Sequence, residues 1–397
     1  MMKKRSWFAV LAFILLLLRF TAEYFKSPIS GIGEQSRDIA APIFHGSDNP
    51  KNLSDWGMVS IKGGELVLSQ SVIPYTLKAP LFTDYAHKLR TIWVPEGQVA
   101  TIQNLDALNF PIGTVISKTF YYPRANQTHE NQNSVLKVKD RQKVNHKTGL
   151  KLTEHRLLET RLLVHREAGW EALSYIWNEA QTNATLTRIG GIIPLSLIDE
   201  NQEEQKFSYI IPNINQCAGC HAPNATSKEL VPLGSRTLQL DTVYGYEDGF
   251  KNQLMKFQEI GFFDSKGEHS DLNALTMARY DDESVALDIR ARGYLDSNCA
   301  HCHNPVGPAD TSGLHLNIEN TSLTHLGVCK NAIAAGAGTG GRLYDIDPGS
   351  SENSILHYRM IITDPGARMP ELGRSLVHKE GADLIAAWID KMENECG

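Results

Sequence analysis

Short hydrophobic runs separated by turn residues dominate the chain between about residue 56 and residue 198. The runs are rich in Val, Ile, Leu, Thr, Tyr and Trp, with Gly, Pro, Asn and Asp between them, which is typical of β-strands joined by turns. The clearest runs cover residues 66–73, 91–94, 113–122, 156–165, 172–177 and 184–189. Many short strands in succession favour an antiparallel β-sandwich or jelly-roll-like domain, which we place at residues 56–200.

The pattern changes to a helical one after residue 250. Helices are predicted at residues 252–260, 283–297 and 379–393. The last of them has an apolar face formed by Leu384, Ile385, Trp388 and Met392. We therefore predict a mostly α-helical domain at residues 281–397, preceded by an irregular segment at residues 201–280.

Residues 1–25 have the pattern of an export signal. Three basic residues precede an apolar run at residues 7–18, which is shorter than the ~20 residues that cross a bilayer as a helix. Residues 21–23 match a cleavage site poorly, so a cleaved signal peptide and a retained N-terminal anchor both stay open. Residues 26–55 are rich in turn residues and are expected to form an irregular lead-in. The expected location is the bacterial periplasm.

Composition narrows the possible functions. The chain has 397 residues, of which 42% are hydrophobic and 21% are charged, as in folded proteins of two or three domains. A formal net charge of −6 gives no support to nucleic-acid binding, which would need a basic excess. Six cysteines are too few for a disulfide-rich scaffold, so their spacing is the informative feature.

Four of the six cysteines lie in two copies of the pattern C-x-x-C-H. The first motif contains Cys217, Cys220 and His221, and the second contains Cys299, Cys302 and His303. This spacing is typical of c-type haem, in which two thiols bond covalently to the porphyrin and the adjacent imidazole binds the iron. We predict two covalently bound haem c groups.

Other roles for these cysteines fit the spacing less well. A zinc site built from two C-x-x-C pairs normally separates them by ~15–20 residues, whereas Cys220 and Cys299 lie several times further apart. A thioredoxin-like redox pair or plain disulfides would give no reason for a histidine after each second cysteine. The predicted export signal agrees with haem attachment, which takes place outside the inner membrane.

The sixth ligand of each iron decides its chemistry, because Met or His closes the iron for electron transfer and an open position permits oxygen or peroxide chemistry. For the second haem we predict Met369, which lies between His303 and the last predicted helix, the order found in class I cytochromes c. Lesser candidates are Met360, His357 and His378. For the first haem the candidates are Met255, Met277, His269 and His87, or no ligand at all.

Two features lie outside the haem motifs. Cys329 and Cys396 are expected to form a disulfide in an oxidising compartment, with free thiols or an intermolecular bridge as alternatives. Residues 137–151 contain six Lys or Arg and a single Asp. This stretch is expected to be a solvated hairpin loop, the alternative being a docking patch for an acidic redox partner.

Several stretches resemble a family of uncharacterised bacterial dihaem c-type cytochromes. They are residues 80–90, 119–124, 156–164, 177–182, 212–217 and 292–314. The resemblance covers about residues 55–397 and implies an exported redox protein with a β-rich N-terminal domain and a class I-like cytochrome c domain. Members are often encoded beside an exported β-helix-type protein, which makes such a protein a candidate partner.

The expected function is therefore electron transfer between redox protein partners, without nucleic acid and with no membrane contact except through an uncleaved N-terminal anchor. The second hypothesis is a dihaem peroxidase or oxidase with an open first haem. Bacterial dihaem peroxidases are built from two cytochrome-like domains, which this spacing fits poorly. The third hypothesis is a surface- or carbohydrate-binding β module coupled to a redox domain.

Overall fold

The computed structural model describes residues 41–102, 107–126, 132–139, 149–263, 276–333, 335–393 and 395–396. The predicted export signal, the first half of the predicted lead-in and most of the Lys-rich stretch lie outside these ranges. The chain divides into residues 1–39 and residues 40–397, and the described helices and strands belong to the second unit. Within the described ranges, no helix is both long and apolar enough to cross a membrane.

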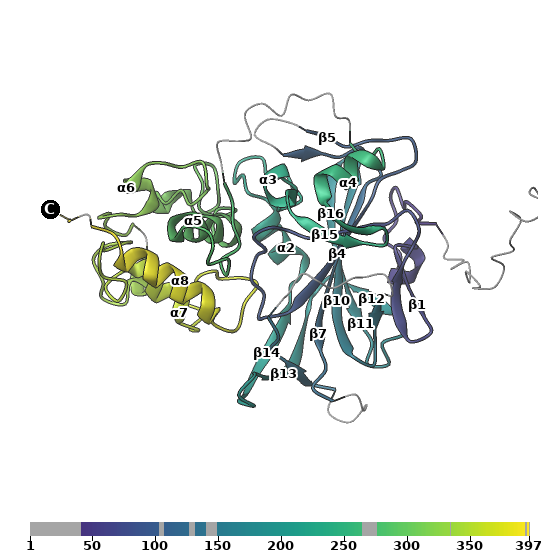
Figure 1. Cartoon of the computed structure of the whole chain (residues 1–397), viewed down its shortest axis with the longest axis horizontal. Helices are drawn as coiled ribbons and strands as arrows, with labels where there is room; N and C mark the ends of the chain where they lie inside the picture. Colours follow the sequence, from purple (N-terminus) through teal and green to yellow (C-terminus); the bar gives the residue numbers. More distant parts are fainter. Residues whose placement is uncertain are drawn as a thin grey trace, which may run out of the picture. The chain divides into compact units, whose positions relative to one another are not determined.

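The N-terminal half of the described chain is built from β-sheets, most of them antiparallel (Figure 1). The central sheet has six strands in the order β12-β11-β10-β7-β4-β3. Their bounds are β3 (Ile73–Tyr75), β4 (His87–Trp93), β7 (Val115–Pro123), β10 (His155–Arg166), β11 (Gly169–Trp177) and β12 (Ala184–Thr187). The prediction of a β-rich N-terminal part with antiparallel sheets is confirmed.

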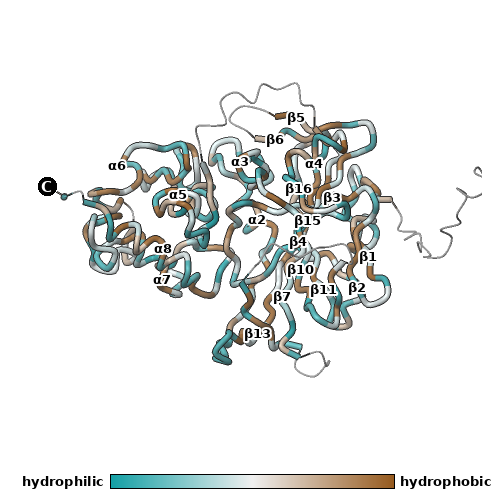
Figure 2. The backbone as a smooth tube through the Cα atoms, in the orientation of Figure 1, coloured by the Kyte–Doolittle hydropathy of each residue, from teal (hydrophilic) through white to brown (hydrophobic). Residues whose placement is uncertain are grey.

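Smaller sheets accompany the central one. One contains β1 (Val59–Lys62), β2 (Glu65–Leu68) and β9 (Leu150–Lys151), and another contains β8 (Ser134–Leu136), β13 (Gly191–Ile198) and β14 (Glu204–Ile211). Two-stranded pairs are β5 (Thr101–Ile102) with β6 (Leu108–Asn109), and β15 (Val243–Tyr246) with β16 (Gly249–Asn252). Figure 2 colours β13 as largely hydrophobic.

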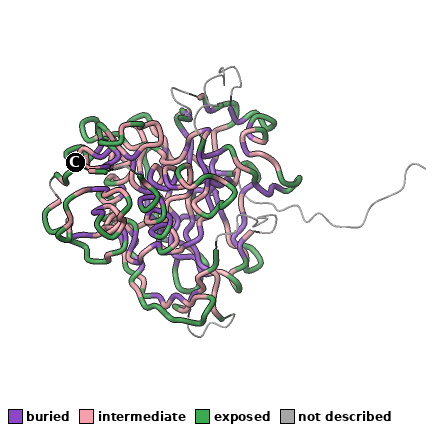
Figure 3. The backbone as a smooth tube through the Cα atoms, turned by 60° about the vertical axis from the view of Figure 1, so that its left-hand side comes forward, coloured by how far each residue is buried: buried purple, intermediate pink, exposed green. Residues whose placement is uncertain are grey.

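One face of the central sheet is an apolar core. Tyr121 on β7, Leu162 on β10 and Tyr175 on β11 pack there against Trp56 and Leu66, which come from the β1–β2 region. The indole of Trp56 donates a hydrogen bond of 2.7 Å to the Tyr175 hydroxyl. Because strand side chains alternate, every second residue of these strands points to the opposite face. In Figure 3 the buried residues, in purple, lie mostly inside and the exposed residues, in green, mostly at the periphery.

The β13–β14 hairpin was not predicted from the sequence. The two strands pair in antiparallel register from Gly191↔Ile211 to Ile198↔Glu204, and β8 adds to β13 in parallel. β14 ends at Ile211, so a strand leads into the first C-x-x-C-H motif. Two residues separate this strand from α2 (Ile214–His221), the helix that contains the motif.

Helices follow the sheets along the chain. They are α2 (Ile214–His221), α3 (Thr237–Leu240), α4 (Gln253–Glu259), α5 (Leu287–Asn298), α6 (Leu323–Leu326), α7 (Ile355–Ile361) and α8 (Lys379–Asp390). Short 3-10 turns are η1 (Leu53–Trp56), η5 (Asp310–Ser312) and η6 (Gly336–Thr339). The three predicted helices correspond to α4, α5 and α8, and α5 begins one turn later than the pattern indicated.

Helices α5 and α8 pack against each other in a second core. The Trp388 indole on α8 donates a hydrogen bond of 2.8 Å to the Asp288 carboxylate on α5. Gly381 lies so close to the ring of Tyr294 that a Cβ atom there would clash with it. The predicted apolar face of the last helix is confirmed, since Leu384 and Ile385 are buried in this core.

A disulfide joins Cys329 to Cys396, as expected from the sequence. It closes a loop with a sequence separation of 67 residues. Closing a loop of this size lowers the conformational entropy of the unfolded chain, which stabilises the folded protein by about 4 kcal/mol. The disulfide therefore fixes the C-terminal end of the chain to the loop that follows α6.

Asp84 connects the β-rich part to the segment that precedes α8. Its Oδ1 accepts hydrogen bonds of 2.7 Å from the backbone N–H groups of Ser375 and Leu376. Its own carbonyl accepts a hydrogen bond from the Tyr122 hydroxyl. Burial raises the pKa of Asp84 to about 6, against the effect of the two backbone hydrogen bonds. The contact holds the last part of the chain against the sheet.

Replacing Asp84 by Ala should destabilise the fold by about 2–4 kcal/mol, because two buried N–H groups would lose their acceptor. Asp84→Asn keeps an acceptor oxygen and should cost less than half as much. Because the folded-state pKa is raised, the folded protein binds the proton more tightly, so wild type should gain stability relative to Asp84→Asn as the pH falls through about 6. Urea unfolding at pH 4.5 and pH 7 measures both effects. Equal stability of the Ala and Asn variants would contradict this role for the carboxylate.

Candidate functional site

The two C-x-x-C-H motifs occupy different local structures. The first lies on α2, which begins with a reciprocal capping box between Asn213 and Gln216. The second starts where α5 ends, with Cys299 as the C-cap residue. The four motif cysteines carry free thiols, so all of them are available for thioether bonds.

The two motifs contact each other, although they lie far apart in the sequence. The Cys302 thiol donates a hydrogen bond of 3.7 Å to the carbonyl of Gly219, inside the first motif. The side-chain amide of Asn304 donates a hydrogen bond of 3.2 Å to the carbonyl of Pro223. A further backbone hydrogen bond joins the loops that follow the motifs. The fold therefore creates one composite site from two distant parts of the chain.

Each motif histidine is held through its Nδ1 atom. Nδ1 of His221 lies 2.9 Å from the Val231 carbonyl, which can only accept, so Nδ1 carries the proton and Nε2 carries the lone pair. Nδ1 of His303 lies 3.1 Å from the Ser312 hydroxyl, which itself donates to the Ala309 carbonyl. Burial lowers the pKa of His221 to about 3 and that of His303 to about 4, which keeps both rings neutral. Both imidazoles thus present Nε2 as a metal ligand.

A cavity of about 420 Å³ lies between the first motif and the second face of the central sheet. Cys217, Cys220 and His221 line it, together with His301 from the second motif. Apolar side chains from β10, β11 and the neighbouring loops form much of the wall. The two cysteines and the histidine of the first motif therefore line one common cavity.

Three cations stand side by side on the sheet wall of this cavity. Arg90 on β4 is the cross-strand partner of Lys118 on β7, and Lys118 is the partner of Arg161 on β10. Like charges at directly opposite positions destabilise a sheet. Burial, together with the charges of Arg90 and Arg161, lowers the pKa of Lys118 to about 7. We call these three residues the cationic row.

One carboxylate compensates part of this charge. Glu159 is fully buried and accepts hydrogen bonds of 2.8 Å from Arg161 Nε and from the Tyr209 hydroxyl. Among the residues that the structure describes, no ion pair joins Lys118 to a carboxylate. The cationic row thus offers a site for further negative charge inside the cavity.

The second motif faces a much smaller pocket, of about 20 Å³. Cys299, Met369, Met360 and His378 line it, so the structure brings the predicted ligand and two lesser candidates to the second motif. His357 does not belong to this wall. A porphyrin needs far more space, so the side chains around this pocket would have to move apart to admit one.

A loop separates the cavity from the small pocket. Pro370, Leu372 and Arg374 line both. The loop is fixed by hydrogen bonds from Arg374 Nε to the Met369 carbonyl at 3.1 Å and from the Met369 N–H to the Arg359 carbonyl at 2.8 Å. The two sites therefore share one wall, formed by the loop that carries Met369.

The described residues predicted as ligands of the first iron do not line the cavity. Met255 is 70% exposed on α4, and Met277 is buried against α5. His87 directs Nε2 to the Val138 carbonyl at 3.1 Å, on the apolar face of the sheet. The structure therefore places none of these three candidates in the cavity wall; His269 lies outside the described residues.

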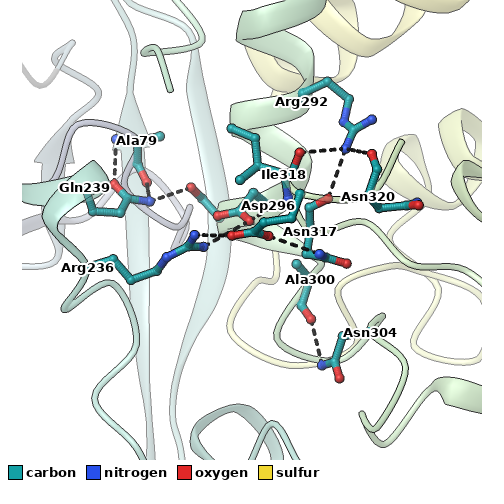
Figure 4. Close-up of polar contacts among 12 residues, drawn as sticks. Ala79, Arg236, Gln239, Arg292, Asp296, Ala300, Asn304, Asn317, Ile318 and Asn320 are labelled. Atoms are coloured by element: carbon teal, nitrogen blue, oxygen red, sulfur yellow. Dashed lines mark hydrogen bonds and ion pairs between the residues drawn. The ribbon is translucent and has the colours of Figure 1, made fainter. Parts of the chain in front are cut away.

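Polar contacts from the α3 region position the end of α5 that leads into the second motif (Figure 4). Arg236 pairs with Asp296 at 3.4 Å. The Gln239 side chain donates hydrogen bonds of 2.9 Å to the Ser297 hydroxyl and 3.1 Å to the Ala79 carbonyl. The second motif is thus anchored both to the β-rich part and to the segment that follows the first motif.

The residues at the first site fit a c-type haem. The cavity combines two thiols, an oriented neutral imidazole, apolar walls and cations that could pair with propionate carboxylates. At the second motif, Cys299 lines the small pocket, whereas Cys302 and His303 do not, and the pocket is too small for a porphyrin. A bare metal ion fits less well, because no cluster of three or more His, Cys, Asp or Glu in the described ranges could hold one.

Sequence reasoning missed the cationic row and His301. On β7, Lys118 shares one strand face with Ile116 and Phe120, which are both apolar. A charged residue in such a position indicates a polar partner on that face. His301 occupies a variable position of the second motif, so the pattern assigned it no role.

Comparisons with known proteins give no assignment for this site: no family model matches the chain, and no curated protein and no solved structure is significantly similar to it. Any functional assignment therefore depends on the geometry of the two motifs and of the cavity.

Arg161→Met is expected to destabilise the protein by about 3–5 kcal/mol, because the buried Glu159 carboxylate would lose its cation. The double variant Arg161→Met/Glu159→Gln should be less damaging, since it leaves no unpaired charge at this position. Denaturant unfolding of the two variants and wild type measures the difference. An equal loss of stability in both would show that the ion pair does not carry the effect.

Proposed function

We propose that the protein is an exported dihaem c-type cytochrome that transfers electrons between redox partners. The observation that carries this proposal is the contact between the two motif regions, which hydrogen bonds from Asn304 to the Pro223 carbonyl and from the Ala225 N–H to the Val306 carbonyl maintain without any thiol. Because the rate of electron transfer falls steeply with distance, two redox groups attached at touching motifs would exchange electrons rapidly. A fold that only needed two separate haem sites would not require this contact.

The residues of the two motifs would hold the cofactors. Cys217, Cys220 and His221 would hold the first haem, and Cys299, Cys302 and His303 would hold the second. A bound haem supplies a reversible one-electron couple whose potential depends on the axial ligands. Met369 is the proposed distal ligand of the second haem, supported by its position in the same pocket wall as Cys299.

The remaining residues of the site position and shield these groups. Val231 and Ser312 accept the Nδ1 protons of the two motif histidines, and in this way orient Nε2. The cationic row provides counter-charges for the propionate carboxylates of the first haem. The loop at residues 370–372 would lie between the two haems, since Pro370 and Leu372 line both sites.

We further propose that residues 281–397 form a class I-like cytochrome c domain and that the N-terminal sheets form a sandwich. The order of α5, the second motif, the Met369 loop and α8 supports the first assignment, as does the packing of Trp388 on α5. The packing of β1 and β2 on the central sheet supports the second. The proposed location is the periplasm, with redox proteins as partners and an exported β-helix-type protein among the candidates.

The exported protein should carry two covalently attached haems. Cys217→Ser/Cys220→Ser should lose one of them and Cys299→Ser/Cys302→Ser the other, because the thioether bonds require these thiols. Intact-protein mass spectrometry after export counts the attached groups. Cys329→Ser/Cys396→Ser is the matched control and should keep both, since those thiols form a disulfide. A wild-type protein without covalent haem would overturn the proposed function.

Met369→Ala should remove the Met-linked absorption band of one haem and lower its reduction potential, because a thioether ligand raises the potential. Optical spectra and a redox titration of the loaded protein measure both. Met255→Ala, an exposed methionine on α4, is the control and should change neither. Loss of the band in Met360→Ala instead would reassign the ligand. Rapid turnover of peroxide by the wild-type protein would favour the dihaem peroxidase hypothesis over electron transfer.

A further inference from the structure

His301 lies between the two thiols of the second motif, but it lines the cavity of the first motif. The cavity wall contains His301 together with Cys217, Cys220 and His221. A side chain that belongs to one haem-attachment motif thus faces the other site. We infer that His301 is the sixth ligand of the first haem iron, an assignment that rests on the proposed function.

The ring of His301 differs from those of the two motif histidines. His221 and His303 each have Nδ1 engaged by an oxygen acceptor. Within the described ranges, no hydrogen bond or ion pair engages a ring nitrogen of His301. A half-buried imidazole that faces a cavity with unused ring nitrogens is suited to bind a metal.

The backbone around His301 is fixed, which gives the ring a defined position. The His303 N–H donates a hydrogen bond of 2.9 Å to the Cys299 carbonyl. The Asn304 side chain donates one of 2.9 Å to the Ala300 carbonyl, drawn in Figure 4. The second motif thus forms a rigid turn with His301 at its centre. A ligand on a rigid turn loses little conformational entropy when it binds.

The other lining side chains give few alternatives. Besides the first motif and His301, no methionine, histidine or cysteine is among the described residues of the cavity wall. Arginines stay protonated and cannot bind iron. Of the two carboxylates in the wall, Asp296 is paired with Arg236 and Glu371 is exposed. The Lys88 ammonium already donates a hydrogen bond of 2.8 Å to the Leu81 carbonyl, so Lys118 is the main rival.

This assignment gives the two haems different ligands. The first would have two histidines, and the second would have a histidine and Met369. A thioether ligand raises the reduction potential relative to a second imidazole. Electrons would therefore move downhill from the first haem to the second, and the first iron would be closed to peroxide.

The test uses the exported, haem-loaded protein with His301→Ala. Low-temperature electron paramagnetic resonance and optical spectra should show that one of the two haems, half of the total, changes from low spin to high spin. The Met-linked band of the other haem should stay. Added imidazole should restore the low-spin state of the altered haem, and His301→Met should keep it low spin with a raised potential. These readouts report on the iron and do not depend on any activity.

His325→Ala, at an exposed histidine outside the cavity wall, is the matched control and should leave both spectra unchanged. Two unchanged haems in His301→Ala would overturn the assignment. A change of the first haem from low spin to high spin in the single variant Lys118→Met would also overturn it. Both results still require two attached haems, so they leave the proposed function intact. Absence of covalent haem from the wild-type protein would instead overturn the proposed function itself.

Discussion

The two faces of the central sheet need different surroundings, one apolar and one able to accommodate charge, and the arrangement of the rest of the chain follows from this difference. One face buries apolar side chains under β1 and β2. The other carries Arg90, Lys118 and Arg161 at one level across three strands. Apolar side chains alone would be a costly cover for three adjacent cations, because the cations would lose their hydration. The chain after β14 therefore encloses a cavity over this face and places the first motif in its wall.

Local patterns in the sequence are sufficient to predict most strands of the central sheet and helices α4, α5 and α8, because each has its own periodicity. The β13–β14 hairpin has no such pattern: Pro194 interrupts β13, and the beginning of β14 is polar and exposed. The motifs themselves can be read from the sequence, but their contact depends on tertiary packing between distant segments of the chain. The cationic row is equally hidden, since only the register of three strands aligns Arg90, Lys118 and Arg161.

The two candidate sites are unequal in a way that matters for electron transfer. The first is roomy and cationic, whereas the second is closed and lined by methionines. Cations beside a haem favour its reduced form, which has one less positive charge, and so raise its potential. A second histidine ligand would act in the opposite direction. With His301 as a ligand, the cationic row would offset part of the fall in potential and keep the two haems close enough in potential to exchange electrons reversibly.

The position of His301 also links the assembly of the two sites. Cys299 and Cys302 flank it, so the turn that would carry the second haem is the same turn that presents the ring to the first cavity. Hydrogen bonds within the motif already fix this turn. A displacement of the turn would withdraw His301 and leave the first iron open, and an open iron reacts with oxygen or peroxide. The proposed ligand therefore makes the closure of the first site depend on the packing of the second motif.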